Sequence, residues 1–453
     1  MGLLEQAGLT ASLAMPAIMS QLSTILMQYI DAAMVGRLGA TASASVGLMN
    51  SSLWLFTGVL SMAVLGFTVQ VAQRLGASDV RGARQVVRES LLSAVIMGTV
   101  MSVIALAIGR ALPRWLGGHG EVAAGASDYF MIISAALPIY TMNYLSGGML
   151  RCAGNMKIPS LFNVLMCLLD VVFNWFLIFP SRTIDIFGSE MQVWGGGMGI
   201  RGAALGTVLA TALCAVAMTW YLLCRQHELK LTGHERGSFM PSRAVLRRAF
   251  QIGSPMSGQQ AVFCGAQMAV TAIVAPLGPV AIAANAFAVT AESLCYMPGF
   301  GIADAATTLC GQAVGARRPA LVRRFGWLST GLGMAVMSFM GILLYFGAPL
   351  MMGILSPVRE IVDLGTEVLR IEAFAEPMYA ASIVAYGAFV GVGDTLIPAV
   401  MNFGSIWCVR VPLAAIMAPI YGLRGVWMAM CFELIFRGII FLLRMKYGRW
   451  IKI

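Results

Sequence analysis

The sequence predicts an all-α membrane protein with twelve transmembrane helices in two six-helix lobes that form a parallel internal repeat. Three observations lead to this fold class: the composition, the number of long apolar stretches, and a constant offset between the two halves. Of the 453 residues, 59% are hydrophobic and 11% are charged, whereas soluble domains contain about 45–50% apolar and about 25% charged residues. The composition therefore excludes a water-soluble monomer.

Twelve apolar stretches are long enough to cross a bilayer, because a transmembrane helix needs about 20 apolar residues. The chain length agrees with this number, since 453 residues divided by about 38 per helix and loop gives twelve. We expect the helices at about residues 9–35, 45–72, 86–108, 123–150, 159–180, 200–224, 249–277, 281–314, 325–347, 362–390, 398–418 and 423–443.

The basic residues are concentrated in the loops on one side of the predicted membrane. With a cytoplasmic N-terminus, the inner loops hold 20 of the 30 Lys and Arg residues and the outer loops hold seven. Because cytoplasmic loops are enriched in Lys and Arg, we expect both termini in the cytoplasm of a bacterium, with the protein in the plasma (inner) membrane. The net charge of +10 comes from these clusters and does not predict a nucleic-acid partner.

A constant shift of 239 residues relates the two halves of the sequence over about 150 positions. Such an offset is not expected between unrelated apolar sequences. Six spans per half is an even number, so both halves enter the membrane in the same sense. The matching pairs include Pro16 and Pro255, Gln73 and Gln312, Arg84 and Arg323, Pro138 and Pro377, Gly154 and Gly393, and Asn163 and Asn402.

Toward the C-terminus the offset falls to 223, which aligns Arg201 with Arg424, and a longer outer loop at 181–197 accounts for the difference. Two parallel six-helix lobes are typical of secondary transporters, which alternate access to a site between the lobes. The repeat divides the chain into an N-terminal lobe at 1–224, a cytoplasmic linker at 225–248 and a C-terminal lobe at 249–453.

Enzyme activity is not expected. The chain has no G-x-x-x-x-G-K-[ST] sequence, so a P-loop for ATP hydrolysis is absent. Its three histidines, His119, His227 and His234, all lie between apolar stretches, so a metal centre inside the membrane would lack its usual nitrogen ligands. We expect no cofactor, and an ion gradient or the substrate's own gradient must supply the energy.

In the first half, two aspartates lie inside predicted spans, where an ionisable residue is costly and indicates a functional site. Asp31 lies toward the outer end of the first span, and Asp170 lies in the fifth. Together they could bind a monovalent cation or a proton, with Asn174 and Thr207 as neutral oxygen ligands. The alternative is that each aspartate is hydrogen-bonded and only holds two helices together.

In the second half, Glu372 and Glu376 are four residues apart and so share a helix face next to Pro377, which can bend the span. An acidic face on the wall of a substrate cavity would attract cations. The alternative is an ion pair with Arg370 or Arg410.

Two further acids, Glu292 and Asp304, lie in the eighth predicted span and are also candidates for the substrate cavity. They are separated by about 120° around a helix and need not share a site. Glu433 and Arg437 are four residues apart, a spacing typical of an internal salt bridge.

Three motifs connect the chain with a known family. The first is the run from Gln28 to Ala40, which contains Asp31. The second is Gly-Gln-x-x-Gly-Ala at Gly311–Ala316, and the third is Gly-Val-Gly-Asp-Thr at Gly391–Thr395, before Pro398. These motifs resemble those of the multidrug and toxic compound extrusion (MATE) family, and the resemblance covers nearly the whole chain and recurs at matching places in both halves.

The resemblance implies twelve helices in two lobes and export of organic cations or other amphiphiles in exchange for Na⁺ or H⁺. It implies that Asp31 and Asp170 are the aspartates of the first and fifth helices that couple transport to the ion. Thr207 matches a site threonine of that branch, and Pro16 matches the proline at which some members bend the first helix.

The chain departs from the family pattern at two places. The asparagine often found one turn before the fifth-helix aspartate is Met166 here, so Asn163 or Asn174 would have to replace it. Another branch binds the cation through a glutamate of the seventh helix, but the matching stretch, Ala261–Cys264, has none. The Glu372 and Glu376 pair is a hypothetical replacement.

We therefore expect a multidrug exporter coupled to Na⁺ or H⁺. Its expected partners are small organic cations or amphiphiles and the lipid bilayer, and the expected state is a monomer. The alternative is a flippase for lipid-linked precursors with the same two lobes. Anionic headgroups would require basic residues in the cavity, whereas intramembrane acids outnumber bases here.

Overall fold

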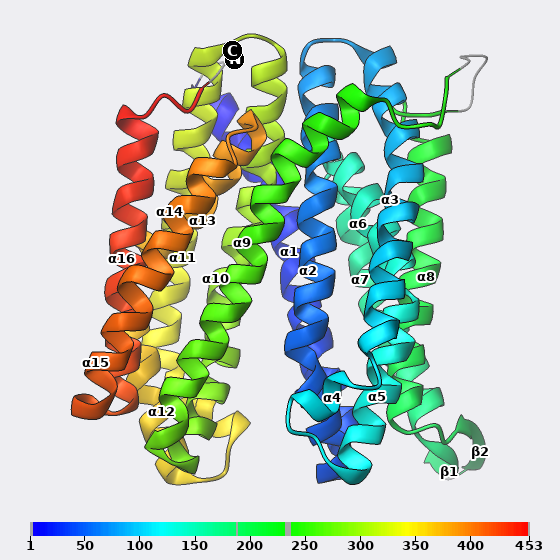
Figure 1. The fold of residues 1–453 in the computed structure, drawn as a ribbon, viewed down its shortest axis with the longest axis vertical. Coiled ribbons are helices and arrows are strands. Elements are labelled where there is room, and N and C mark those ends of the chain that lie inside the picture. The colour runs from blue at the N-terminus through cyan, green and yellow to red at the C-terminus, as the bar shows by residue number, and fades with distance from the viewer. Residues whose placement is uncertain (1–2, 187–188, 232–236, 452–453) are drawn as a thin grey trace.

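The computed structural model describes residues 3–186, 189–231 and 237–451. Two helical bundles stand side by side, and both termini lie at the same end of the bundles (Figure 1). We call this the terminal end. The opposite end, which carries a small β-hairpin, is called the hairpin end (Figure 1).

The first bundle is built from long apolar helices joined by short turns. Its first two helices run the full length of the bundle, and its fourth span is made of two shorter helices. The elements are α1 (Leu3–Gly36), α2 (Ala40–Gly76), α3 (Val80–Ile108), α4 (Leu112–Trp115), α5 (Gly120–Ala135), α6 (Leu137–Cys152), α7 (Lys157–Ile178), β1 (Pro180–Ile186), β2 (Ser189–Gly196) and α8 (Ile200–Cys224).

The second bundle repeats the order of the first, and its described residues, 237–451, include no counterpart of the hairpin. Its fifth span contains a π-helical turn, at which the Val411 N–H donates to the Ile406 carbonyl five residues back. The elements are α9 (Arg243–Val274), η1 (Ala275–Leu277), α10 (Pro279–Gly315), α11 (Pro319–Leu355), α12 (Arg359–Glu372), α13 (Glu376–Val392), α14 (Leu396–Ser405), η2 (Ile406–Arg410), α15 (Val411–Tyr421) and α16 (Leu423–Tyr447).

The described residues form ten helices that are long and apolar enough to span a membrane, and two bent pairs that bring the number to twelve. The pair α5 and α6 is bent by 49° before Pro138, and the pair α12 and α13 by 59° before Pro377. Proline removes a backbone donor and disfavours helical geometry in the preceding residue. The predicted twelve-helix, two-lobe fold is confirmed, as is the bend at Pro377.

The segment predicted as an outer loop at 181–197 is largely a β-hairpin. β1 pairs antiparallel with β2, with Pro180 opposite Gly196. A side chain at Gly195 would place its Cβ 2.3 Å from the Phe179 carbonyl oxygen, so the strands approach this closely only because the residue is glycine. The sequence predicted a loop at this place, so the hairpin refines that expectation, and the all-α class holds for the membrane spans.

The internal repeat is also visible in the backbone. The turns before α2 and α10 contain Gly39 and Gly278, which have φ values of 113° and 101° and are partners under the offset that relates the two halves of the sequence. Such values favour glycine because it has no Cβ. The same offset relates Ser78 (61°) to Arg317 (54°) and Gly154 (80°) to Gly393 (86°), and the shorter offset near the C-terminus relates Gly199 (56°) to Gly422 (62°).

The two bundles pack through their first two helices. α2 packs on α9, and α1 packs on α10, which is the same contact repeated by the internal symmetry. Small residues allow this approach, as in other membrane helix pairs. A Cβ at Gly66 would lie 2.2 Å from the Ala249 carbonyl oxygen, and one at Gly301 would lie 2.7 Å from the Ile18 nitrogen.

At the terminal end, two glutamines join the lobes in a symmetric way. Gln73 Nε2 donates to the Gly391 carbonyl oxygen at 3.2 Å, and Gln312 Nε2 donates to the Cys152 carbonyl oxygen at 2.8 Å. The offset of the internal repeat relates the two donors to each other and the two acceptors to each other. We call these two hydrogen bonds the glutamine latch. They connect α2 to α13 and α10 to α6, so each lobe holds the other.

Candidate functional site

The N-terminal lobe brings the two predicted aspartates together through one amide. Asn174 Nδ2 donates to Oδ1 of Asp31 at 2.9 Å and to Oδ2 of Asp170 at 3.1 Å. Asp170 and Asn174 share a face of α7, because they are four residues apart, and their exposed fractions are 0% and 1%. The half-buried Asp31 reaches them from α1, which packs along α7.

Helices α5 and α8 complete the surroundings of the two aspartates. The Thr207 hydroxyl of α8 donates to the Ala203 carbonyl oxygen at 3.1 Å and lies close to the Asp170 carboxyl, and Tyr129 of α5 lies within electrostatic range of both aspartates. Gly206 allows α8 to approach, because a Cβ there would lie 2.0 Å from Asn174 Oδ1. Four helices therefore converge on one polar cluster inside the lobe.

The oxygen atoms of this cluster fit a small hard cation or a proton. Asp170 Oδ1 and Asn174 Oδ1 are buried without a hydrogen bond of ordinary geometry, which is rare for buried polar atoms. Hard cations take carboxylate, amide and hydroxyl oxygens as ligands, and paired intramembrane carboxylates also carry protons.

Two other predicted residues lie apart from the aspartates. Asn163 Nδ2 donates to Ser20 Oγ at 2.6 Å, so Asn174 is the asparagine in contact with both aspartates. Pro16 lies inside α1, which is one helix from Leu3 to Gly36. The predicted bend at Pro16 belongs to a second conformation of α1, so it stays a prediction.

In the C-terminal lobe, Glu372 and Glu376 are fully buried, and none of their four carboxyl oxygens has a hydrogen-bond partner among the described residues. They do not share one continuous helix as the spacing predicted, because α12 ends at Glu372 and α13 begins at Glu376. Glu292 of α10, with 5% exposure, lies within electrostatic range of both. Three acids therefore meet around the bend in the fourth span of this lobe.

The alternative partners predicted for these glutamates are engaged elsewhere. Arg410 donates from Nε and Nη2 to Glu433 Oε2 at 2.9 and 2.7 Å. Arg437 lies 3.2 Å from Glu433 Oε1, which confirms the predicted salt bridge. Arg370 Nε donates to the Tyr345 carbonyl oxygen at 3.2 Å, and its guanidinium stacks on the Tyr345 ring.

Asp304 lies apart from Glu292, which the 120° separation allowed. Its carboxyl is half-buried and lies 3.9 Å from Arg151 Nε of the other lobe. It therefore contributes an ion pair between α10 and α6. Among the described residues, no group of three or more His, Cys, Asp or Glu side chains is arranged to hold a metal ion.

Comparison with known proteins identifies the family. A family model described as MatE matches residues 16–176 and again 255–416, and the offset of the internal repeat relates the starts of the two matches. The chain belongs to the MatE family. It is a multi-pass membrane protein, and the double match coincides with the internal repeat.

The relatives of this MatE protein match it over most of its length. A probable multidrug resistance protein NorM of Thermotoga maritima is 27% identical over 97% of the chain and 92% of its own length. A protein of the same description from Pseudomonas aeruginosa is 27% identical over 92% and 84%.

Solved structures share the fold of this MatE protein. A crystal structure of MATE in complex with MaL6 superposes with a TM-score of 0.88 at 21% identity, over 97% of this chain and 96% of that one. A MOP superfamily transporter from Pyrococcus furiosus gives 0.89 at 22%, over 99% and 97%.

Sequence reasoning missed some residues of both sites. Tyr129 is one tyrosine in an apolar span, and nothing in its spacing connects it with Asp31 or Asp170. The salt bridge of Glu433 with Arg437 was predicted from i,i+4 spacing, but the contact with Arg410 joins two spans. A periodicity signal does not report contacts between helices.

We expect Glu433→Gln to destabilise the C-terminal lobe strongly. The change leaves Arg410 buried without its charged partner, and breaking a buried ion pair in this way costs about 3–5 kcal/mol. The control is Glu367→Gln, because Glu367 pairs with Arg424 at an exposed position and exposed pairs contribute about 0–1 kcal/mol. Thermal unfolding of both variants in detergent measures the difference, and equal melting temperatures would contradict the expectation.

Proposed function

We propose that this protein is a multidrug exporter that moves organic cations or other amphiphiles out of a bacterial cell in exchange for Na⁺ or H⁺. The single observation that carries the proposal is the pair of intramembrane aspartates, Asp31 and Asp170, bridged by Asn174. Burying two carboxyl groups in one lobe is expensive unless a proton or cation is bound there. The descriptions of the NorM relatives support the multidrug substrate class.

Coupling follows from a difference in affinity between two lobe arrangements. In this proposal, an external ion occupies the Asp31 and Asp170 carboxyls together with Asn174 and Thr207. Ion binding favours a conformation in which α1 is bent at Pro16. In this conformation the protein has a low affinity for the substrate. Loss of the ion to the cytoplasm restores substrate affinity.

The acids of the C-terminal lobe support a cationic rather than an anionic substrate. Glu372 and Glu376 have no hydrogen-bond partner among the described residues, whereas Arg410 and Arg437 are both paired with Glu433. The arginines thus offer no free positive site for a pyrophosphate headgroup. This pattern gives no support to the alternative of a flippase for lipid-linked precursors.

The orientation in the membrane is also part of the proposal. The terminal end carries the clusters of Lys and Arg that the positive-inside rule places in the cytoplasm. The latch at this end, formed by Gln73 and Gln312, would then separate the path between the lobes from the cytoplasm. The hairpin end would face outward.

Transport into proteoliposomes tests the proposal. Purified protein is reconstituted with a fluorescent organic cation, and a pH jump and a Na⁺ jump are applied in separate experiments. Movement of the dye that follows one gradient and stops when that gradient is collapsed identifies the coupling ion. Folded protein that moves the dye under neither gradient contradicts the proposal.

A further inference from the structure

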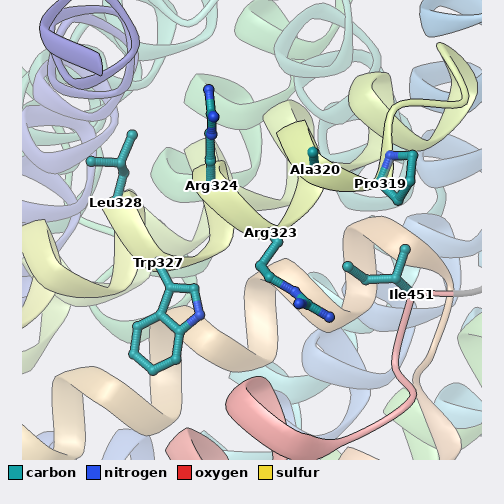
Figure 2. Close-up of a pocket in the computed structure, with 7 residues that line it drawn as sticks. All are labelled: Pro319, Ala320, Arg323, Arg324, Trp327, Leu328 and Ile451. Atoms are coloured by element: carbon teal, nitrogen blue, oxygen red, sulfur yellow. The ribbon is translucent and has the colours of Figure 1, made fainter.

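The beginning of α11 at the terminal end forms a pocket that the transport site does not use. The pocket has a volume of about 850 Å³ and is lined by Arg323, Arg324, Trp327, Leu328 and Ile451, among others. Figure 2 shows Arg323 between Trp327 and Ile451, with its guanidinium on the side of Ile451, whereas Arg324 extends in a different direction. The lining therefore combines two basic groups with an apolar side.

Neither guanidinium of this pocket has an ion-pair or hydrogen-bond partner among the residues that the structure describes. Both arginines are exposed, and Trp327 has an exposed fraction of 39%. The predicted apolar span begins at residue 325, so the arginines lie just outside the hydrocarbon region and Trp327 lies at its boundary. Tryptophan prefers this depth, and basic residues there attract anionic lipids.

On the corresponding surface of the other lobe, the polar side chains have hydrogen-bond acceptors that Arg323 and Arg324 lack among the described residues. Arg84, the repeat partner of Arg323, donates from Nε to the Glu228 carbonyl oxygen at 2.9 Å and from Nη2 to the His227 carbonyl oxygen at 3.3 Å. The next residue, Gln85, donates to the Ser238 carbonyl oxygen at 2.9 Å. The linker therefore satisfies the polar groups at the start of α3 with its own carbonyl groups.

We propose that the pocket binds the headgroup of an anionic phospholipid from the adjacent leaflet. Arg323 donates to the phosphate, whose oxygens take the place of the backbone carbonyl oxygens that accept from Arg84 in the other lobe. Arg324, which extends in a different direction, adds to the positive charge of the pocket. Trp327 and Leu328 contact the glycerol and the first acyl carbons. The ligand chemistry is a phosphate diester joined to an apolar chain, and the site does not depend on the function proposed above.

Native mass spectrometry of the delipidated full-length protein in detergent tests the lipid site. The probes are dioleoyl phosphatidylglycerol and, for comparison, zwitterionic dioleoyl phosphatidylcholine. We expect phosphatidylglycerol to bind more tightly, and the Arg323→Gln/Arg324→Gln variant to weaken this binding by about tenfold or more. The control, Arg317→Gln/Arg318→Gln, removes the same charge from the preceding turn, outside the pocket lining, and should keep wild-type affinity.

Each other outcome overturns the proposal. Equal binding of the two lipids, or an equal loss in both double variants, means that only general surface charge attracts lipid. Displacement of phosphatidylglycerol by an equal concentration of glycerol 3-phosphate assigns the pocket to a soluble phosphate.

A fluorescence measurement locates the lipid. Brominated phosphatidylglycerol should quench the emission of the wild type more than that of Trp327→Phe, because bromine atoms near Trp327 quench only that residue. The same fractional quenching in both proteins places the lipid elsewhere and contradicts the site. Thermal unfolding of each variant verifies that a lost signal does not come from a misfolded protein.

Discussion

Asp31→Asn should fold normally and lose gradient-driven transport to the background level of empty liposomes. The asparagine that replaces Asp31 keeps a carbonyl oxygen that accepts from Asn174 Nδ2, so the contact of 2.9 Å between α1 and α7 is retained. It removes the charge that holds a cation and the carboxyl that carries a proton. Asp170→Asn should give the same loss, because the two carboxyls belong to one site.

The measurement is dye transport in proteoliposomes, with Asp128→Asn as the matched control. Asp128 also loses one charge, but it is exposed and pairs with Arg201 at 2.8 Å. We expect this control to transport at nearly the wild-type rate. Wild-type transport by Asp31→Asn would contradict the assignment of the coupling site.

An equilibrium measurement separates ion binding from transport. A ligand that binds only the folded protein raises its thermal stability, by RT ln(1 + [L]/Kd). If Na⁺ is the coupling ion, added NaCl should raise the melting temperature of the wild type more than KCl does. Asp31→Asn and Asp170→Asn should lose this difference, whereas Asp128→Asn should keep it.

The fold could be predicted in detail because its main features repeat in the sequence. The offset that relates Pro138 to Pro377 also relates the bends before these two prolines. The helices extend past the predicted stretches, as α11 does at Pro319–Leu355 against the predicted 325–347. Hydropathy marks the part of a helix inside the membrane, and hydrogen bonding continues the helix into the loop.

The candidate sites could be predicted only in part. Asp31 and Asp170 were predictable because a carboxyl inside an apolar span is expensive. Their bridge through Asn174 follows from i,i+4 spacing on α7, but the choice between Asn174 and Asn163 needed the structure. The pairing of Arg410 with Glu433 joins two helices whose relative rotation no single-sequence pattern contains.

A second large effect is expected at the terminal end, where the two lobes meet backbone to backbone. A Cβ at Gly76 would lie 1.9 Å from the Gln312 carbonyl oxygen, and one at Gly315 would lie 1.8 Å from the Gln73 carbonyl oxygen. Backbone atoms cannot rotate away, so Gly76→Ala or Gly315→Ala must separate α2 from α10. The glutamine latch, whose donors are on the same turns, should break as well.

We expect either substitution to disfavour the arrangement seen here and to slow transport. Overpacking typically costs about 1–3 kcal/mol, which changes the equilibrium between two arrangements by about 5- to 150-fold. Spin labels at Ser78→Cys and Arg317→Cys, in a background without the native cysteines, report the separation of the lobes. The distance distribution should shift to longer values in Gly76→Ala.

The control is Gly47→Ala, because Gly47 also lies in α2 but a Cβ at this position would have no atom within 4 Å. It should leave both the spin-label distance and the transport rate unchanged. The double variant Gly76→Ala/Gly315→Ala supplies a further test, since both glycines act on one contact. If one methyl group already separates the lobes, the second adds little, and the two effects are not additive. Fully additive effects, or an unchanged distance in Gly76→Ala, would mean that the glycine contact does not control the closed arrangement.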